Sequence, residues 1–111
     1  MAYDEELANL LREALADEDG LSERPMFGGL AFLLAGNMAV AVSGRGGLLV
    51  RVGREGAAAA CERPHAEQAV MGSRPMTGWV RVGAEGVRGI RSVRVWARTA
   101  ADFTRTLPPK G

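Results

Sequence analysis

At 111 residues, with 47% hydrophobic and 24% charged residues, the chain has the composition of one globular domain, which excludes a disordered chain and two independent domains. Its net charge of +1 hides an asymmetry, because residues 1–23 carry −7 and residues 24–111 carry +8. Cys61 is the sole cysteine, which excludes an internal disulfide and favours the reducing cytoplasm. We predict a single domain over residues 1–111.

The charge asymmetry has two interpretations. Such polarity can steer association with a charged partner. It also arises when a negative helix lies beside a positive surface of its own domain, and we favour this internal interpretation.

The chain begins with a predicted amphipathic helix over residues 3–18. Its start is acidic and not basic, which argues against a secretory signal. Asp17, Glu18 and Asp19 crowd the negative end of the helix dipole and help to end the helix before Gly20. Apolar side chains recur at helical spacing and form one face: Tyr3, Leu7, Leu10, Leu11, Ala14 and Leu15.

Residues 28–52 predict an antiparallel meander of three strands. Gly36-Asn37 and Gly44–Gly47 supply the two turns. The uncharged stretch from Met26 to Gly44 has the length of a membrane span, but glycines and polar residues interrupt it, so we expect strands and no bilayer helix. In the middle strand Met38, Val40 and Val42 alternate with Ala39 and Ala41. The alanine face would let a helix or a partner approach closely.

The second half of the chain predicts one more strand and one more long helix. The alanine-rich segment 54–71 is broken at Pro64, and we expect two short helical pieces there. A fourth strand follows over residues 77–83, and an amphipathic helix over residues 88–106. The fold class is therefore α+β, with an antiparallel sheet of about four strands (the meander and the later strand) and N- and C-terminal amphipathic helices. The expected core includes Leu11, Phe32, Val42, Val50, Trp79, Trp96 and Phe103.

The pentapeptide Arg-Pro-Met-x-Gly occurs twice, at residues 24–28 and 74–78. We favour a structural role at paired strand entries, where proline stiffens the chain, methionine enters a core and glycine permits a bend. The alternative is an anion-binding concavity flanked by Arg24 and Arg74, if the two strand starts are neighbours.

The sequence offers no recognisable catalytic, metal or cofactor motif. His65 is the sole histidine, and a pair with Cys61 has Pro64 between the two residues and no third group. Zinc needs about four ligands, which this pair does not provide. We predict no catalytic residues, no metal and no cofactor, and hence a protein that is not an enzyme.

A row of arginines on the C-terminal helix is the best candidate for nucleic-acid binding, because guanidinium groups along one face can meet successive phosphates. A solvated helix face gives the same pattern, and we favour that interpretation. The row consists of Arg91, Arg94, Arg98 and Arg105.

Three segments resemble the N-terminal domain of the TfoX/Sxy family, named for regulators of bacterial competence. They are RPMFGGLAFLLAGNMAVAV after the first helix, the later MGSRPMTGWVRV, and the Trp-bearing last helix that ends LPPK. The resemblance spans nearly the whole chain and implies an α+β domain with an antiparallel sheet, without catalytic residues to transfer. Full regulators of this type carry a second, helical domain, whereas this sequence stops at Gly111, so we expect a protein similar to the N-terminal domain alone. LLVRVG departs from the family's more usual Tyr-Leu-Lys-Val-Asp form.

Our first hypothesis is a cytoplasmic, non-enzymatic, TfoX-like domain with a regulatory or interaction role. We expect it to act through a protein partner or as a homo-oligomer, and to make no membrane contact. Its contact surface would be the acidic first helix or the small-residue sheet face. The alternatives are nucleic-acid binding through the arginine row and a small-anion or metabolite site at Arg24 and Arg74.

Overall fold

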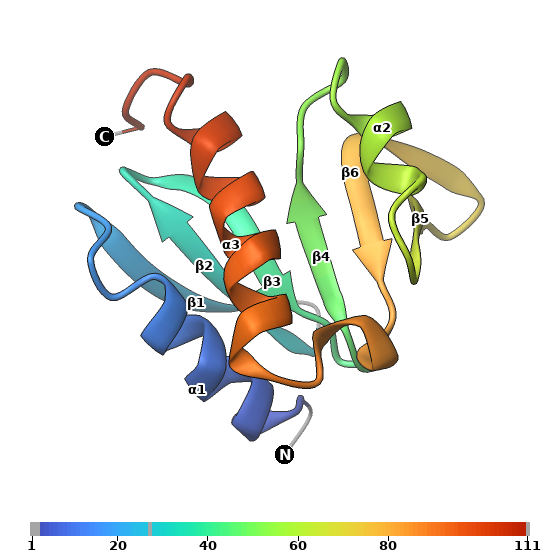
Figure 1. The fold of residues 1–111 in the computed structure, drawn as a ribbon. Helices are drawn as coiled ribbons and strands as arrows, with labels where there is room; N and C mark the ends of the chain where they lie inside the picture. The colour runs from blue at the N-terminus through green and yellow to red at the C-terminus, as the bar shows by residue number, and fades with distance from the viewer. Residues whose placement is uncertain (1–2, 27, 111) are drawn as a thin grey trace.

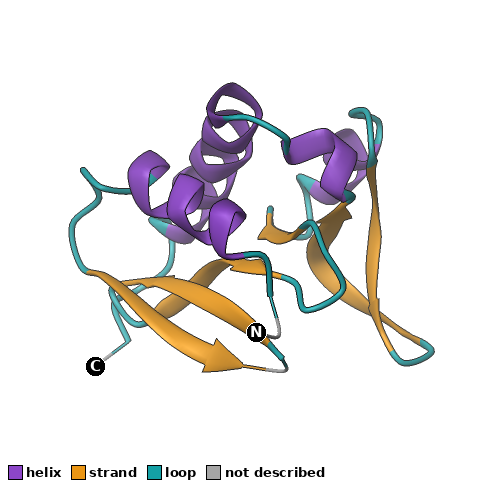
Figure 2. Cartoon of the chain, turned by 90° about the horizontal axis from the view of Figure 1, so that it is seen from below, coloured by secondary structure: helices purple, strands orange, loops and turns teal. Residues whose placement is uncertain are grey.

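The computed structural model describes residues 3–26 and 28–110, in which helices pack on one face of a six-stranded sheet (Figure 1). Figure 2 shows the two layers from the side, with the helices together on one side of the strands. The elements are, in chain order, α1 (Glu5–Ala14), β1 (Leu21–Met26), β2 (Gly29–Leu34), β3 (Asn37–Val42), β4 (Leu48–Arg51), α2 (Ala57–Cys61), β5 (Ala66–Met71), β6 (Arg74–Val82), the 3-10 turn η1 (Ala84–Val87) and α3 (Ile90–Thr104).

The sheet confirms the predicted class and corrects the predicted number of strands. Its order is β1-β2-β3-β4-β6-β5, and every neighbouring pair is antiparallel. The predicted meander is β2, β3 and β4, and the predicted later strand is β6. The two additional strands, β1 and β5, form the edges, so the prediction of about four strands was too low.

The prediction for the alanine-rich segment 54–71 was half correct. Its first piece is the short helix α2, as predicted. The second piece is not helical but forms the edge strand β5, after a reversal at His65, whose φ is +66°. The break at Pro64 therefore separates a helix from a strand.

The turn between β2 and β3 lies one residue earlier than predicted. Ala35 (φ +50°) and Gly36 (φ +84°) occupy its two central positions, as expected for a tight hairpin. Asn37 is already the first residue of β3, and its side-chain amide donates a 2.9 Å hydrogen bond to the Pro108 carbonyl.

A β-bulge changes which side chains of β3 share a face. Val40 pairs with Phe32 and Met38 pairs with Leu33, so the register shifts at Ala39. Val40 therefore faces the helices, whereas Met38 lies on the opposite face with Ala41. The expectation that Met38 and Val40 share one face was wrong.

The helix layer begins at α1, which is shorter than the predicted residues 3–18. The Asp4 carboxylate caps it by accepting a 3.1 Å hydrogen bond from the Leu7 amide. The last helix, α3, lies within the predicted residues 88–106. Within residues 3–26 and 28–110, no helix combines the length and the apolar character that crossing a bilayer requires.

The core lies between the helices and the sheet and includes most of the predicted residues. Leu11, Phe32, Val42, Val50 and Trp96 are buried. Trp79 and Phe103 are only half-buried, which corrects the prediction for these two side chains. Both rings lie near the Arg51 guanidinium, whose carbon is 5.6 Å from the Trp79 ring centroid and 5.9 Å from that of Phe103.

The two pentapeptides lie at strand ends, but they are not paired strand entries. The first ends β1 and the second begins β6, so the predicted equivalence was wrong. Pro25 lies in an edge strand, where its missing N–H is tolerated. Gly28 (φ +77°) and Gly78 (φ +85°) both adopt the left-handed conformation, which explains the glycine in each copy.

Candidate functional site

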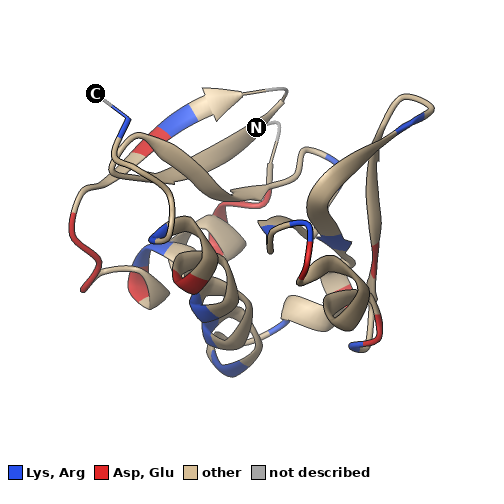
Figure 3. Cartoon of the chain, turned by 90° about the horizontal axis from the view of Figure 1, so that it is seen from above, with Lys and Arg blue, Asp and Glu red and all other residues tan. Residues whose placement is uncertain are grey.

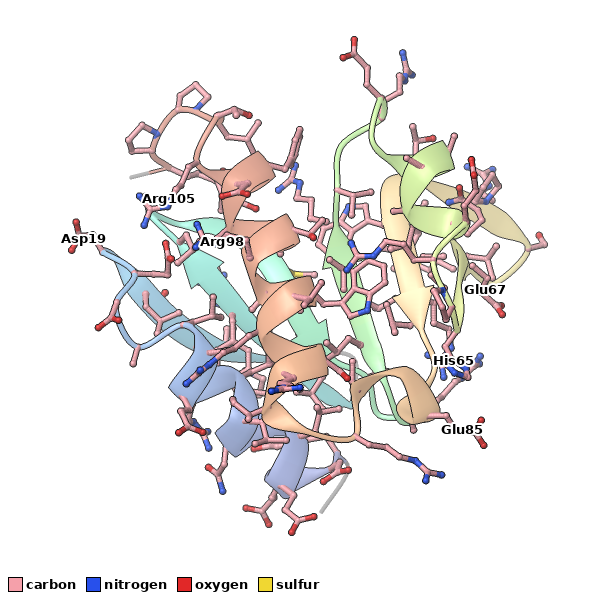
Figure 4. The ribbon with its side chains drawn as sticks, viewed as in Figure 1. Asp19, His65, Glu67, Glu85, Arg98 and Arg105 are labelled. Atoms are coloured by element: carbon pink, nitrogen blue, oxygen red, sulfur yellow. The ribbon has the colours of Figure 1, made fainter. Side chains whose placement is uncertain are left out.

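The acidic N-terminal helix and the arginine-bearing α3 lie side by side in the helix layer (Figure 3). Arg105 donates to the Glu18 carboxylate, through Nε at 2.8 Å and through Nη2. Arg94 and Arg98 line a hollow of about 280 Å³ together with Asp17 and Glu18. Figure 4 shows the Arg98 and Arg105 side chains on the side of α3 that meets the loop carrying Asp19. The internal interpretation of the charge asymmetry thus has direct structural support.

The ion pair between Arg105 and Glu18 also changes the pKa of the arginine. The hydrogen bonds to Glu18 raise the pKa of Arg105. Arg91 stays exposed on α3. Because much of the arginine row faces acids of its own chain, its availability to phosphates is reduced, and nucleic-acid binding stays a prediction.

Arg12 of α1 forms an ion pair with Glu23 of β1. Its Nε and Nη2 each donate a 2.7 Å hydrogen bond to the Glu23 carboxylate. This pair lowers the pKa of Glu23 from its ordinary value of 4.5. A carboxyl group whose pKa is depressed in the folded state stabilises the fold above its unfolded pKa and loses that contribution as the pH falls through the folded pKa.

We therefore expect the Glu23→Gln protein to lose less stability than the wild type between pH 5 and pH 3, because glutamine cannot be protonated in this range. Thermal midpoints measured at half-unit steps of pH check this expectation. Asp102→Asn is the control, since it removes an exposed acid from α3. An unchanged acid dependence in the Glu23→Gln protein would contradict the expectation.

Arg24 and Arg74, the predicted anion-binding pair, lie far apart in the sheet order. Four strand spacings of about 4.8 Å separate β1 from β6, or about 19 Å along the sheet. The strand starts are therefore not neighbours, and the adjacency on which that site depended is absent. Both arginines are exposed.

Cys61 and His65, the candidate pair of the sequence analysis, lie in different local structures. Cys61 is the last residue of α2 and is half-buried, whereas His65 lies beyond the helix in a left-handed turn and is exposed. Within the part of the chain that the structure describes, no three His, Cys, Asp or Glu residues are placed to hold a metal ion together.

Near His65, a hollow of about 370 Å³ lies where Arg63 meets α3. The Arg63 guanidinium carbon is 3.4 Å from the Trp96 ring centroid, and Nη1 donates a 3.0 Å hydrogen bond to the Thr99 hydroxyl. Burial lowers the pKa of Arg63. These contacts account for the side chain structurally, because they join the segment after α2 to α3.

The face of the sheet that points away from the helices is apolar. Three of its side chains are buried without any helix over them: Ala31, Leu33 and Ala41. Half-buried larger side chains pack around them, namely Met26, Met38 and Leu49. We call this surface the open face. Small residues lie at its centre, and methionines lie at its sides.

The open face continues into a groove of about 600 Å³ that reaches the β5–β6 hairpin. Gly28, after β1, and Gly72, in the β5–β6 turn, both line it, so the curved sheet brings its two end hairpins to either side of the groove (Figure 2). The remaining lining residues are Ser43, Gly44, Arg45, Leu49, Glu67, Val70, Met71, Met76 and Arg81. Val70 and Met71 are 57% and 54% exposed, which is unusual for large apolar side chains.

Arg81 is held in a fixed position in this groove. Nη1 donates to the Ser43 hydroxyl and Nη2 to the Gly46 carbonyl, both at 3.1 Å. Neither acceptor is a carboxylate, so the positive charge of this half-buried guanidinium is not neutralised by these bonds.

Sequence reasoning named the small-residue sheet face as a contact surface but missed most of the residues that form it. The methionines of the open face come from four strands, and β5 was not predicted as a strand. Met38 reaches this face through the bulge at Ala39, which no sequence pattern indicates. The exposed pair Val70-Met71 beside a Gly-Ser turn was the available signal.

Comparison with known proteins gives one finding. Neither the curated proteins nor the solved structures contain a match to this sequence. The description of the family that does match is TfoX N-terminal domain, and the match runs over residues 13–104, from within α1 to the end of α3. The chain therefore belongs to the TfoX N-terminal domain family.

Proposed function

We propose that this TfoX N-terminal domain is a non-enzymatic interaction module that binds a protein through the open face and its groove. The observation that carries the proposal is the exposure of Val70 and Met71 at the rim of a groove that none of the described helices covers. Exposed apolar surface of this kind is typical of protein contact sites. A regulatory role agrees with such a module, since regulation by binding needs a surface and no catalytic group.

The non-enzymatic part of the proposal is supported by the side chains that line the groove. The groove holds one carboxylate, Glu67, and no histidine or cysteine among its lining residues. A nucleophile beside a general base, which covalent catalysis needs, is therefore not assembled there. A second copy of the chain is one partner that this proposal allows.

Site-specific photo-crosslinking tests the proposal. A photoreactive amino acid replaces Met71 in one protein and Arg91 in another, and each is irradiated in extract of the source cells. We expect discrete protein adducts from position 71, identified by mass spectrometry, and none from position 91, which is also exposed but lies on α3. Adducts from position 91 alone would contradict the proposal.

Titration of labelled duplex DNA and RNA separates the nucleic-acid alternative. Steeply salt-dependent binding that Arg94→Glu with Arg98→Glu weakens would favour the arginine row as the functional surface. We expect no such binding, because Asp17 and Glu18 share the hollow of these two arginines.

A further inference from the structure

The geometry points to an acidic amphipathic helix of a partner protein as the occupant of the groove. This inference rests on the proposed function and adds the secondary structure and the charge of the bound segment. Three properties of the groove carry it: the pairing of its floor strands, the four large apolar side chains in its mixed lining and its excess of arginine.

The floor of the groove consists of strands whose backbone groups are already paired. β4, which contributes Leu49, pairs with β3 on one side and with β6 on the other. A partner strand therefore finds no free backbone N–H or C=O there, and strand addition is possible only at the sheet edges. Over this floor, away from the edge strands β1 and β5, a segment binds through side chains, as the apolar face of a helix does.

The dimensions also suit a helix. An α-helix with its side chains is about 10–12 Å across, and the floor from β1 to β6 spans about 19 Å along the curved sheet. On the adjoining open face, Ala31 and Ala41 present only small side chains. Leu49, Met71 and Met76 supply flexible or exposed apolar side chains that adapt to the anchors of such a helix.

The charge of the groove selects an acidic partner. Arg45 and Arg81 line it, against Glu67 as the acid among its lining residues. Arg24 pairs with Ala31 and Arg74 pairs with Met71, and directly paired residues project on the same side of a sheet, so both arginines flank the open face. The acids of α1 lie in the helix layer on the other side of the sheet (Figure 3), and Glu18 and Glu23 pair with Arg105 and Arg12.

Peptide selection followed by binding measurements tests the inference. A displayed library of peptides of about 18 residues, long enough to form helices, carries randomised apolar anchors and randomised flanking positions. Selection uses the whole wild-type protein, with counter-selection against Met71→Asp. We expect enrichment of helical peptides with Glu and Asp at the flanks, binding that shifts the methyl NMR signals of the groove methionines, and affinity that falls by roughly tenfold or more in Arg24→Glu with Arg74→Glu.

Arg91→Glu makes the same type of charge reversal on α3 and is the matched control, for which we expect less than about twofold change. Circular dichroism and thermal midpoints verify that each variant folds. Since Arg24, Arg74 and Met71 are exposed, these substitutions remove no core contact.

The outcomes separate the inference from the proposed function. Selected peptides that shift the methionine signals but are basic, neutral or extended would overturn the acidic helix and leave the open face as a contact surface. If no selected peptide shifts these signals, both are overturned.

Discussion

Replacement of Phe32 by alanine should destabilise the domain by about 3–5 kcal/mol, the range found for aromatic side chains truncated in well-packed cores. Phe32 is fully buried in β2, between the helices and the sheet. Its neighbours in β1 and β3 are held by strand pairing, so they cannot close the cavity that alanine leaves. The free energy of unfolding, measured by urea titration, checks this expectation.

Phe103→Ala makes the same chemical change at a half-buried position and is the control. We expect a smaller loss, about 1–2 kcal/mol, because less apolar area leaves water there on folding. Equal losses in the two variants would show that the core does not centre on Phe32.

Alanine at Gly47 should destabilise the fold by about 2–5 kcal/mol. Gly47 has a φ of +74°, which costs an L-residue about 1–2 kcal/mol, and overpacking adds about 1–3 kcal/mol. Its Cβ would overlap the carbonyl oxygen of Val82, a backbone atom. Val82 pairs with both Leu48 and Ala66, so it cannot retreat without disrupting β6.

Gly46→Ala isolates the steric part of this effect. Gly46 also has a positive φ, +94°, but a Cβ there meets nothing within 4 Å. Urea titration of both variants should therefore give about 1–2 kcal/mol for Gly46→Ala, the conformational cost alone. A loss at Gly47 no larger than that at Gly46 would contradict the overlap with Val82.

The sequence predicts the centre of the sheet well and its edges poorly, for a physical reason. β2, β3 and β4 bury most of their side chains, so their apolar residues stand out between turn signals. β1 and β5 are edge strands in which most side chains are exposed, and their sequences LSERPM and AEQAVM carry no clear apolar alternation. Hydrophobic patterns report burial, and an edge strand buries little.

The contact between the two terminal helices was predictable from their charges, whereas the groove was not predictable from the sequence. Arg105 and Glu18 are far apart in sequence, yet the opposite charges of the two terminal helices already favoured an internal pairing. The groove depends on the bulge at Ala39 and on the curvature that places Gly28 and Gly72 along one hollow. Both are properties of the assembled sheet and leave no local pattern in the chain.

The position of α3 at the end of the element order has a consequence for synthesis on the ribosome. α3 contacts β3 and β4, and Trp96 and Ala100 belong to the buried cluster above the sheet. A nascent chain that has reached η1 contains every strand, but residues such as Val42 and Val50 still lack the helix that covers them. Until residues 90–104 have emerged, the growing chain exposes an apolar sheet to solvent, which is the condition under which nascent chains aggregate or engage chaperones.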